Sequence, residues 1–235
     1  MSTMNRRTFL GLAAGALGSA ALVACGGQQG TQASASSSSS SSSSSGASSS
    51  SEAGHISAAG TLTTPYDEGY STGKHHATIK VKDFGTIKVE LDADTAPITV
   101  SNFAHLANAG FYNGLTFHRI IKDFMVQGGD PNGDGSGGSD VNILGEFSAN
   151  GKKNDIKHER GVISMARSQA NNSASSQFFI VHKDSNHLDG QYAGFGHVTE
   201  GLDVVDKLAE VKAEEGTGSV AKKDQPVIES IAMDD

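Results

Sequence analysis

The chain has 235 residues, which is enough for one domain of ordinary size and an additional segment. Its formal net charge of −8 argues against a nucleic-acid binder, because phosphate contacts need a basic surface. A single cysteine excludes a disulfide framework. The 29 glycines and 4 prolines favour a loop-rich β protein over a helical bundle.

Residues 1–24 are typical of a bacterial export signal. Arg6 and Arg7 precede an apolar run, 10–24, that is too short for a membrane-spanning helix. Paired arginines favour the twin-arginine route, and a general secretory signal is the alternative. The run ends in the letters LVAC, which resemble a lipobox, so we expect Cys25 to carry a lipid. The plainer alternative is an ordinary cleavage site beside an incidental cysteine.

Residues 25–60 are predicted to be a disordered tether. They consist mainly of Ser, Gly, Ala and Gln, with an unbroken serine run from Ser36 to Ser45. Such a segment has little apolar surface to bury and is expected to stay a flexible coil. About 35 residues of this composition have a root-mean-square reach on the order of 30–35 Å.

Residues 61–235 have the composition of a single domain. Alternating apolar residues predict strands at 74–82 and 85–91, with a hairpin turn at Phe84-Gly85. Further short apolar runs predict strands at 117–121, 124–127, 161–166, 177–182, 194–198 and 227–232.

Two helices are predicted among these strands. Thr95 is the expected N-cap of the first, with Pro97 in its first turn and Gly110 at its end. The second is expected over 202–211, where apolar residues share one face. About eight short strands with two helices indicate a closed barrel or a sandwich, and the periodicity does not decide between them.

The sequence offers few of the usual catalytic patterns. It lacks HExxH and CxxC, and we predict neither a metal nor a cofactor. The loop DPNGDG (130–135) matches the first half of an EF-hand, but Val141 stands where a bidentate Glu is needed, so calcium binding there remains an incidental alternative. Ser164 lacks the glycine pattern of a hydrolase nucleophile.

One charged residue stands out inside an apolar strand. Arg119 alternates with Phe117 and Ile121, and Gln127 follows in the next predicted strand. An arginine at the centre of a strand is usually a solvated, outward-facing residue. The alternative is a ligand groove in which Gln127 orients the guanidinium beside an apolar pocket.

These segments resemble the cyclophilins, which are peptidyl-prolyl isomerases. The resemblance rests on seven segments in family order, namely FHRII (117–121), FMVQGGD (124–130), GSGG (135–138), GVISMA (161–166), SQFFI (176–180), LDG (188–190) and FG (195–196). It covers about 77–233 and implies a mainly β fold, a closed eight-stranded antiparallel β-barrel capped by two α-helices.

The resemblance also implies a site. Matching positions give Arg119, Gln127 and Phe124 as catalytic residues. Those expected to bind substrate are Met125, Ala166, Arg167, Gln177, Phe179, His187, Leu188 and Tyr192.

Three of these positions depart from the family pattern. Arg167 replaces an Asn that the family uses through its backbone, so the change is expected to be tolerated. His187 stands where many members have Trp, and Tyr192 where the best-studied kind has His. Loss of the indole removes apolar area and a hydrogen-bond donor, so we expect weakened binding of cyclosporin.

The sequence therefore predicts a peptidyl-prolyl cis-trans isomerase that assists the folding of exported proteins. We expect a monomer without a cofactor or a nucleic-acid partner, held by its N-terminal lipid on the outer face of the bacterial cell membrane. The main alternative is a proline-motif binding module or chaperone of the same fold with weak or no turnover. An unrelated small-molecule barrel enzyme is a third.

Overall fold

The computed structural model describes residues 60–235. The predicted signal segment, Cys25 and the predicted tether up to residue 59 lie outside the described residues. The elements in chain order are β1 (Thr61–Leu62), β2 (Lys74–Val81), β3 (Gly85–Asp92), α1 (Pro97–Asn108), β4 (Thr116–Ile121), β5 (Met125–Asp130), β6 (Asn142–Ile143), β7 (Val162–Met165), β8 (Phe178–Val181), β9 (Gly194–Glu200), α2 (Leu202–Ala209) and β10 (Ile228–Met233).

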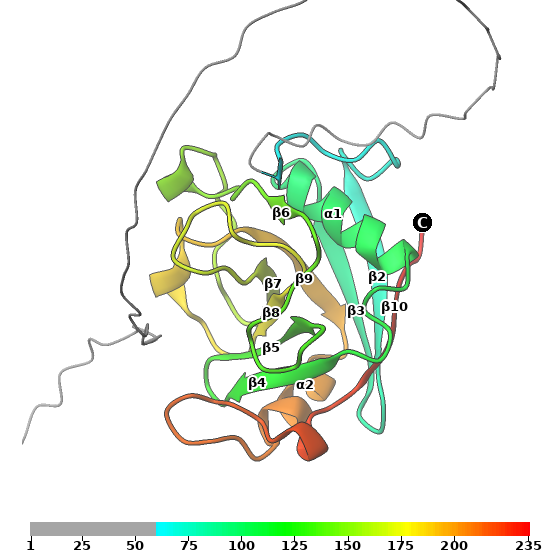
Figure 1. Ribbon diagram of the computed structural model, residues 1–235, viewed down its shortest axis with the longest axis vertical. Helices are drawn as coiled ribbons and strands as arrows, with labels where there is room; N and C mark the ends of the chain where they lie inside the picture. Colours follow the sequence, from blue (N-terminus) through cyan, green and yellow to red (C-terminus); the bar gives the residue numbers. More distant parts are fainter. Residues whose placement is uncertain (1–59) are drawn as a thin grey trace, which may run out of the picture. The chain divides into compact units, whose positions relative to one another are not determined.

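The eight predicted strands form one curled sheet in the order β10-β2-β3-β9-β7-β8-β5-β4 (Figure 1). Every neighbouring pair in it is antiparallel. The mainly β class with two α-helices is thus confirmed. The parallel pair β1–β6 was not predicted, because two residues per strand are too few to show a period.

The prediction of a closed barrel is wrong, because the ladder is open between β4 and β10. These edge strands meet at one end only, where Thr116 bridges Val227 and the Phe117 N–H donates to the Pro226 carbonyl at 2.9 Å. Pro226 has no N–H to return that bond. The sheet is therefore a half-barrel whose edges touch without forming a continuous ladder.

A loop after α2 covers the rest of the β4 edge. The Ile120 N–H donates to the Gly218 carbonyl at 2.7 Å, and the Val220 N–H donates to the His118 carbonyl at 2.9 Å. Backbone groups that would otherwise seek a partner strand are satisfied in this way. The same loop will matter for the candidate site, because it also reaches Arg119.

The N-terminus of α1 is capped by a distant carboxylate. Glu146 accepts hydrogen bonds from the N–H groups of Ile98 and Thr99 at 3.0 and 2.8 Å. The prediction of Thr95 as N-cap is wrong, since Ala96 occupies that position and the Thr95 hydroxyl donates to Asp92 instead. Burial raises the pKa of Glu146, and its bonds from Thr99 and Ile98 oppose that shift.

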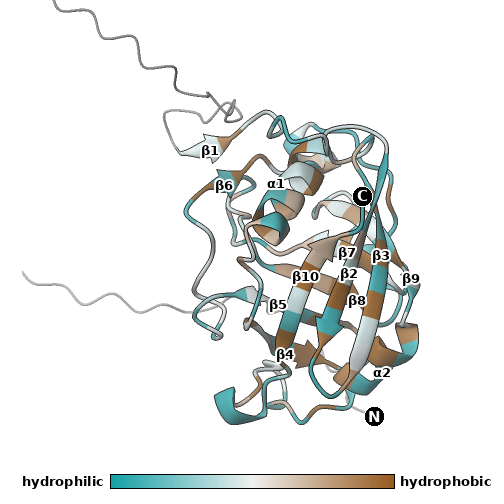
Figure 2. Cartoon of the chain, turned by 90° about the vertical axis from the view of Figure 1, so that its right-hand side faces the viewer, coloured by the Kyte–Doolittle hydropathy of each residue, from teal (hydrophilic) through white to brown (hydrophobic). Residues whose placement is uncertain are grey.

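The two helices lie at opposite ends of the curled sheet (Figures 1 and 2). Strands β2 and β3 alternate between hydrophobic and hydrophilic residues along their length (Figure 2), as expected when one face is buried. The enclosed main core includes a cluster of aromatic rings with centroids 5.2 to 5.7 Å apart, formed by Phe103, Tyr112, Phe178 and Phe195. No helix within residues 60–235 is long and apolar enough to cross a membrane.

Candidate active site

A second, smaller apolar cluster lies apart from the main core. We call it the groove cluster; its buried members are Met125, Val162, Phe179, Val181 and Leu188. Partly buried residues, among them Phe124, Ala166 and Tyr192, pack against it. Because side chains alternate along a strand, β8 sends Phe178 into the main core and Phe179 into the groove cluster.

Arg119 is held beside this cluster by two neighbours. Its Nε donates to the Thr217 carbonyl at 2.9 Å, and one terminal nitrogen donates to Gln127 Oε1 at 3.3 Å. Gln127 is also the register partner of Arg119 in the β4–β5 pair. Burial lowers the pKa of Arg119 from its ordinary value, while Tyr192 acts in the opposite sense. An arginine remains charged under such a shift, so the site contains a fixed cation.

Gln127 is itself oriented by a further amide. Its Nε2 donates to Gln177 Oε1 at 2.9 Å, and Gln177 Nε2 donates to the carbonyls of Gly135 and Gly137 at 3.1 and 2.7 Å. The chain of bonds therefore runs from the glycine-rich loop to the guanidinium. Each amide has its oxygen and nitrogen assigned by its neighbours.

The glycine-rich loop is folded by its first acidic residue. The carboxylate of Asp130 accepts hydrogen bonds from the N–H groups of Asn132, Asp134 and Gly135. The EF-hand-like pattern thus corresponds to a turn built around Asp130, which places the Gly135 carbonyl against Gln177. Within residues 60–235, no group of three or more His, Cys, Asp and Glu residues is placed to hold a metal ion.

The predicted rim residues lie around the groove cluster. The exposed ring of His187 lies 5.5 Å from that of Phe124, centroid to centroid. Phe124 is presented by a tight turn in which Asp123 has a φ of 61°. Tyr192 meets Phe179 edge-on at 6.0 Å. The Ala166 N–H donates to the Gln177 carbonyl at 2.9 Å.

Arg167 uses its side chain, which the sequence did not predict. Its guanidinium carbon lies 4.9 Å from the ring centroid of Phe147 and 4.8 Å from that of Tyr192. The two rings come from segments far apart in the sequence. Sequence spacing could not identify Phe147 or Tyr192 as a ring that contacts Arg167.

A buried polar group lies behind the groove cluster. His158 Nδ1 is 3.1 Å from Asp189 Oδ1, and His158 Nε2 is 3.0 Å from Ser164 Oγ. This order resembles a hydrolase triad, but the His158 and Ser164 side chains are fully buried, so no substrate can reach the hydroxyl. The ring of His158 is stacked against Phe179 at 6.1 Å, which makes the group a support for the pocket floor.

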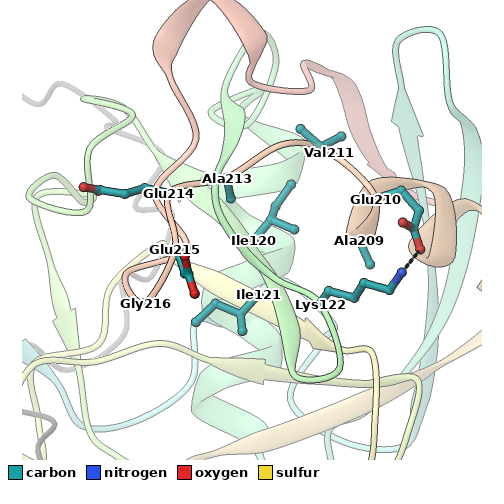
Figure 3. Close-up of a pocket in the computed structure, with 11 residues that line it drawn as sticks. Ile120, Ile121, Lys122, Ala209, Glu210, Val211, Ala213, Glu214, Glu215 and Gly216 are labelled. Atoms are coloured by element: carbon teal, nitrogen blue, oxygen red, sulfur yellow. Dashed lines mark ion pairs between the residues drawn. The ribbon is translucent and has the colours of Figure 1, made fainter.

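A separate cavity of about 330 Å³ lies between the end of β4 and the segment that follows α2 (Figure 3). Ile120, Ile121 and Val211 contribute apolar walls. Lys122 and Glu210 form an ion pair of 2.6 Å at its margin (Figure 3). None of the predicted site residues lines it, so the cavity and the groove are distinct.

Comparisons with known proteins agree on one family. The family described as "Cyclophilin type peptidyl-prolyl cis-trans isomerase/CLD" matches residues 76–233. A peptidyl-prolyl cis-trans isomerase of Helicobacter pylori is 47% identical over 135 residues, which are 57% of this chain and 79% of that protein. A Rhizopus delemar protein named peptidyl-prolyl cis-trans isomerase-like 2 is 44% identical over 143 residues, 60% of this chain but only 26% of its own length.

The fold is similar to a solved structure as well. A cyclophilin type peptidyl-prolyl cis-trans isomerase of Cryptosporidium parvum, solved in the presence of the dipeptide Ala-Pro, matches with a TM-score of 0.61 and 30% identity. The match covers 68% of this chain and 99% of that one. Because the matched range contains the half-barrel, the groove cluster and the residues that hold Arg119, we conclude that the chain belongs to the cyclophilin-type peptidyl-prolyl cis-trans isomerase family.

Proposed function

We propose that this chain catalyses cis-trans rotation of Xaa-Pro peptide bonds at the groove cluster, with Arg119 as the principal catalytic residue. One observation carries the proposal. A guanidinium fixed by Gln127 and by the Thr217 carbonyl lies beside an apolar pocket suited to a proline ring.

Isomerisation is a rotation about the Xaa-Pro peptide bond of the substrate, and no covalent bond is made or broken. Rotation about an amide bond costs about 18–20 kcal/mol because it disrupts resonance. An uncatalysed Xaa-Pro bond therefore isomerises over tens to hundreds of seconds. A donor aimed at the proline nitrogen stabilises its lone pair as resonance is lost, and this lowers the barrier.

The residues divide this work between them. Arg119 donates toward the proline nitrogen in the rotated state. Phe124, Met125 and Phe179 bury the pyrrolidine ring and hold it still while the preceding carbonyl turns. Shortening about 100 s to about 10 ms is a factor of about 10⁴, or about 5.5 kcal/mol. Aimed hydrogen-bond donors in a partly dry pocket supply energies of this order.

Exchange spectroscopy on a model Xaa-Pro peptide tests the proposal. With the full chain added, cis and trans signals should exchange at least a hundred times faster than without it. If the rate stays unchanged while peptide resonances still shift on binding, the protein is a recognition module, which is the alternative that the replacements at His187 and Tyr192 favour. If neither rate nor shifts change, both functions fall.

We also infer from the sequence that the chain is exported and held at the outer face of the cell membrane through a lipid on Cys25, where it assists the folding of exported proteins. The lipobox-like letters and the serine-rich segment that follows support this proposal. Cys25→Ser should move the protein from the membrane fraction to the soluble fraction. A variant that stays with the membrane would contradict the lipid attachment.

A further inference from the structure

Arg167 is a cation at the edge of the groove whose guanidinium is fixed by ring contacts and backbone hydrogen bonds. Besides the two rings at 4.9 and 4.8 Å, three backbone carbonyls accept hydrogen bonds from it. Its Nε donates to Gln191 at 2.9 Å, and one terminal nitrogen donates to Ser168 and Gln169 at 2.9 and 3.2 Å. Contacts from several directions fix both the position and the plane of the guanidinium.

All of these partners are neutral. Among residues 60–235, no carboxylate lies within ion-pair distance of Arg167, and its second terminal nitrogen has no hydrogen-bond partner. Arg160 shows the contrast, since its two terminal nitrogens bind the carboxylate of Asp206 at 2.7 and 3.0 Å. The positive charge of Arg167 is therefore oriented but not compensated.

This charge lies close to the position proposed for the substrate. Tyr192 connects Arg167 with Phe179, because its ring centroid lies 4.8 Å from the guanidinium carbon and 6.0 Å from the Phe179 ring. Arg167 also directly follows Ala166, which borders the groove cluster. With Arg119, the groove carries two fixed cations.

The nearby carboxylate has other partners. Asp189 directly follows Leu188 of the groove cluster, but one of its oxygens binds the backbone and ring of His158, and the other lies 3.5 Å from Lys157. It is therefore not available to neutralise the guanidinium of Arg167. In a chain of net charge −8, the edge of this groove is locally positive.

We propose that Arg167 makes the groove select Xaa-Pro segments that carry an acidic side chain next to the proline. The inference rests on the proposed isomerase function and names its substrate class. A carboxylate on the bound peptide reaches the unpartnered terminal nitrogen of Arg167 and forms a charge-assisted hydrogen bond. A glutamine side chain of the same length can accept a hydrogen bond from the guanidinium but brings no opposite charge to it.

Three peptides, Ala-Glu-Pro-Phe, Ala-Gln-Pro-Phe and Ala-Lys-Pro-Phe, test this with the full chain. The Glu peptide should show a kcat/KM about three to ten times that of the Gln peptide, with the Lys peptide lowest. The Glu-to-Gln ratio should shrink at high salt, because the partly exposed pair is screened. Equal values for Glu and Gln peptides at low salt would overturn the proposal.

Matched variants assign the effect to one side chain. Arg167→Met keeps an apolar stem next to the two rings and should bring the Glu-to-Gln ratio to about one. Arg167→Lys keeps the charge and should retain part of the ratio. Arg160→Met is the control, because that arginine lies on the surface with Asp206, and it should behave as the wild type. An unchanged ratio in Arg167→Met would exclude Arg167 as the selecting residue.

The dissociation constants of the same peptides, measured by NMR titration, test the selectivity proposal independently of the proposed isomerase function. If no peptide is isomerised, the proposed function fails. The Glu-to-Gln affinity ratio in wild type and Arg167→Met then decides selectivity by itself. A ratio of one in the wild type would reject it.

Discussion

The main core and the groove cluster are built from the same strands but differ in what surrounds them. Strand β8 supplies Phe178 to the main core, where rings enclose it, and Phe179 to the groove cluster, where Tyr192 and His158 flank it. Strand β5 divides Val126 and Met125 in the same way. A period of two thus sorts neighbouring residues into those that stabilise the fold and those that form the site.

The largest difference in stability between the two regions should appear when Phe178 and Phe179 are each replaced by alanine. Phe178→Ala should lower the free energy of unfolding by about 3–5 kcal/mol, because it empties a closed aromatic cluster. Phe179→Ala should cost clearly less, since the groove cluster is open at its rim, yet it should reduce kcat/KM more per folded molecule. Urea unfolding and peptide exchange measure the two effects, and equal losses of stability would break the comparison.

The amide network should affect turnover without affecting the fold. Gln127→Ala removes a hydrogen bond worth about 1 kcal/mol from Arg119, so we expect kcat to fall about fivefold with little change in KM. Gln169→Ala is the control, because this exposed glutamine contacts the site only through its backbone. A rise in KM with kcat unchanged would show that Gln127 binds substrate instead of positioning Arg119.

Acidification should destabilise the fold through the buried His118 of β4, while Arg119 keeps its positive charge. Burial lowers the pKa of His118 from its ordinary value of 6.5, and neither ring nitrogen has a hydrogen-bond partner among the described residues. Asp130 opposes that shift, and Arg119 reinforces it. His118 therefore takes up a proton near pH 6.5 in the unfolded chain but only at a lower pH in the folded chain. The stability that is present above pH 6.5 is lost as the pH falls below that value.

The slope should be up to about 1.4 kcal/mol per pH unit from this histidine. Urea unfolding of wild type and His118→Leu at pH 7.5 and 5.5 measures it, and the variant should lose less stability on acidification. Other titrating groups, including His158 and Glu146, are common to both proteins and cancel in the difference. Identical losses in the two proteins would contradict the argument.

The smallest effect is expected at the rim. His187→Trp adds apolar area beside Phe124 and replaces the imidazole by an indole with its N–H donor, so cyclosporin should bind a fewfold more tightly. His76→Trp, on β2 away from the groove, is the matched control and should change nothing. Isothermal titration measures both. An unchanged affinity in His187→Trp would mean that this position does not contact the drug.

Local patterns predicted the strands and helices because each reflects a period within one segment. The strand predicted at 85–91 is β3, which extends one residue further to Asp92. The first helix contains Pro97 in its first turn as predicted, although its N-cap is Ala96 and not Thr95. The errors concern contacts between distant segments. Glu146 caps α1 although it lies 47 residues away in the sequence. The loop at Gly218 binds the backbone of β4, which would pair with β10 in a closed barrel.

The candidate site divides in the same way. The sequence around Arg119 and Gln127 predicted that these two side chains interact, and their pairing in the β4–β5 register explains why they do. Sequence could not point to the Thr217 carbonyl, because any residue type supplies one. It also could not show that Arg167 contacts two rings, since the segments that carry those rings meet only in the folded chain.

The most direct test of the central claim compares the wild type, Arg119→Ala and Arg119→Lys by exchange spectroscopy on one Xaa-Pro peptide. Circular dichroism first establishes that all three are folded. We predict at least a tenfold loss of turnover in Arg119→Ala and partial activity in Arg119→Lys, which keeps the charge but loses the fork that binds Gln127 and Thr217. Equal rates for the wild type and Arg119→Ala would remove Arg119 from the mechanism.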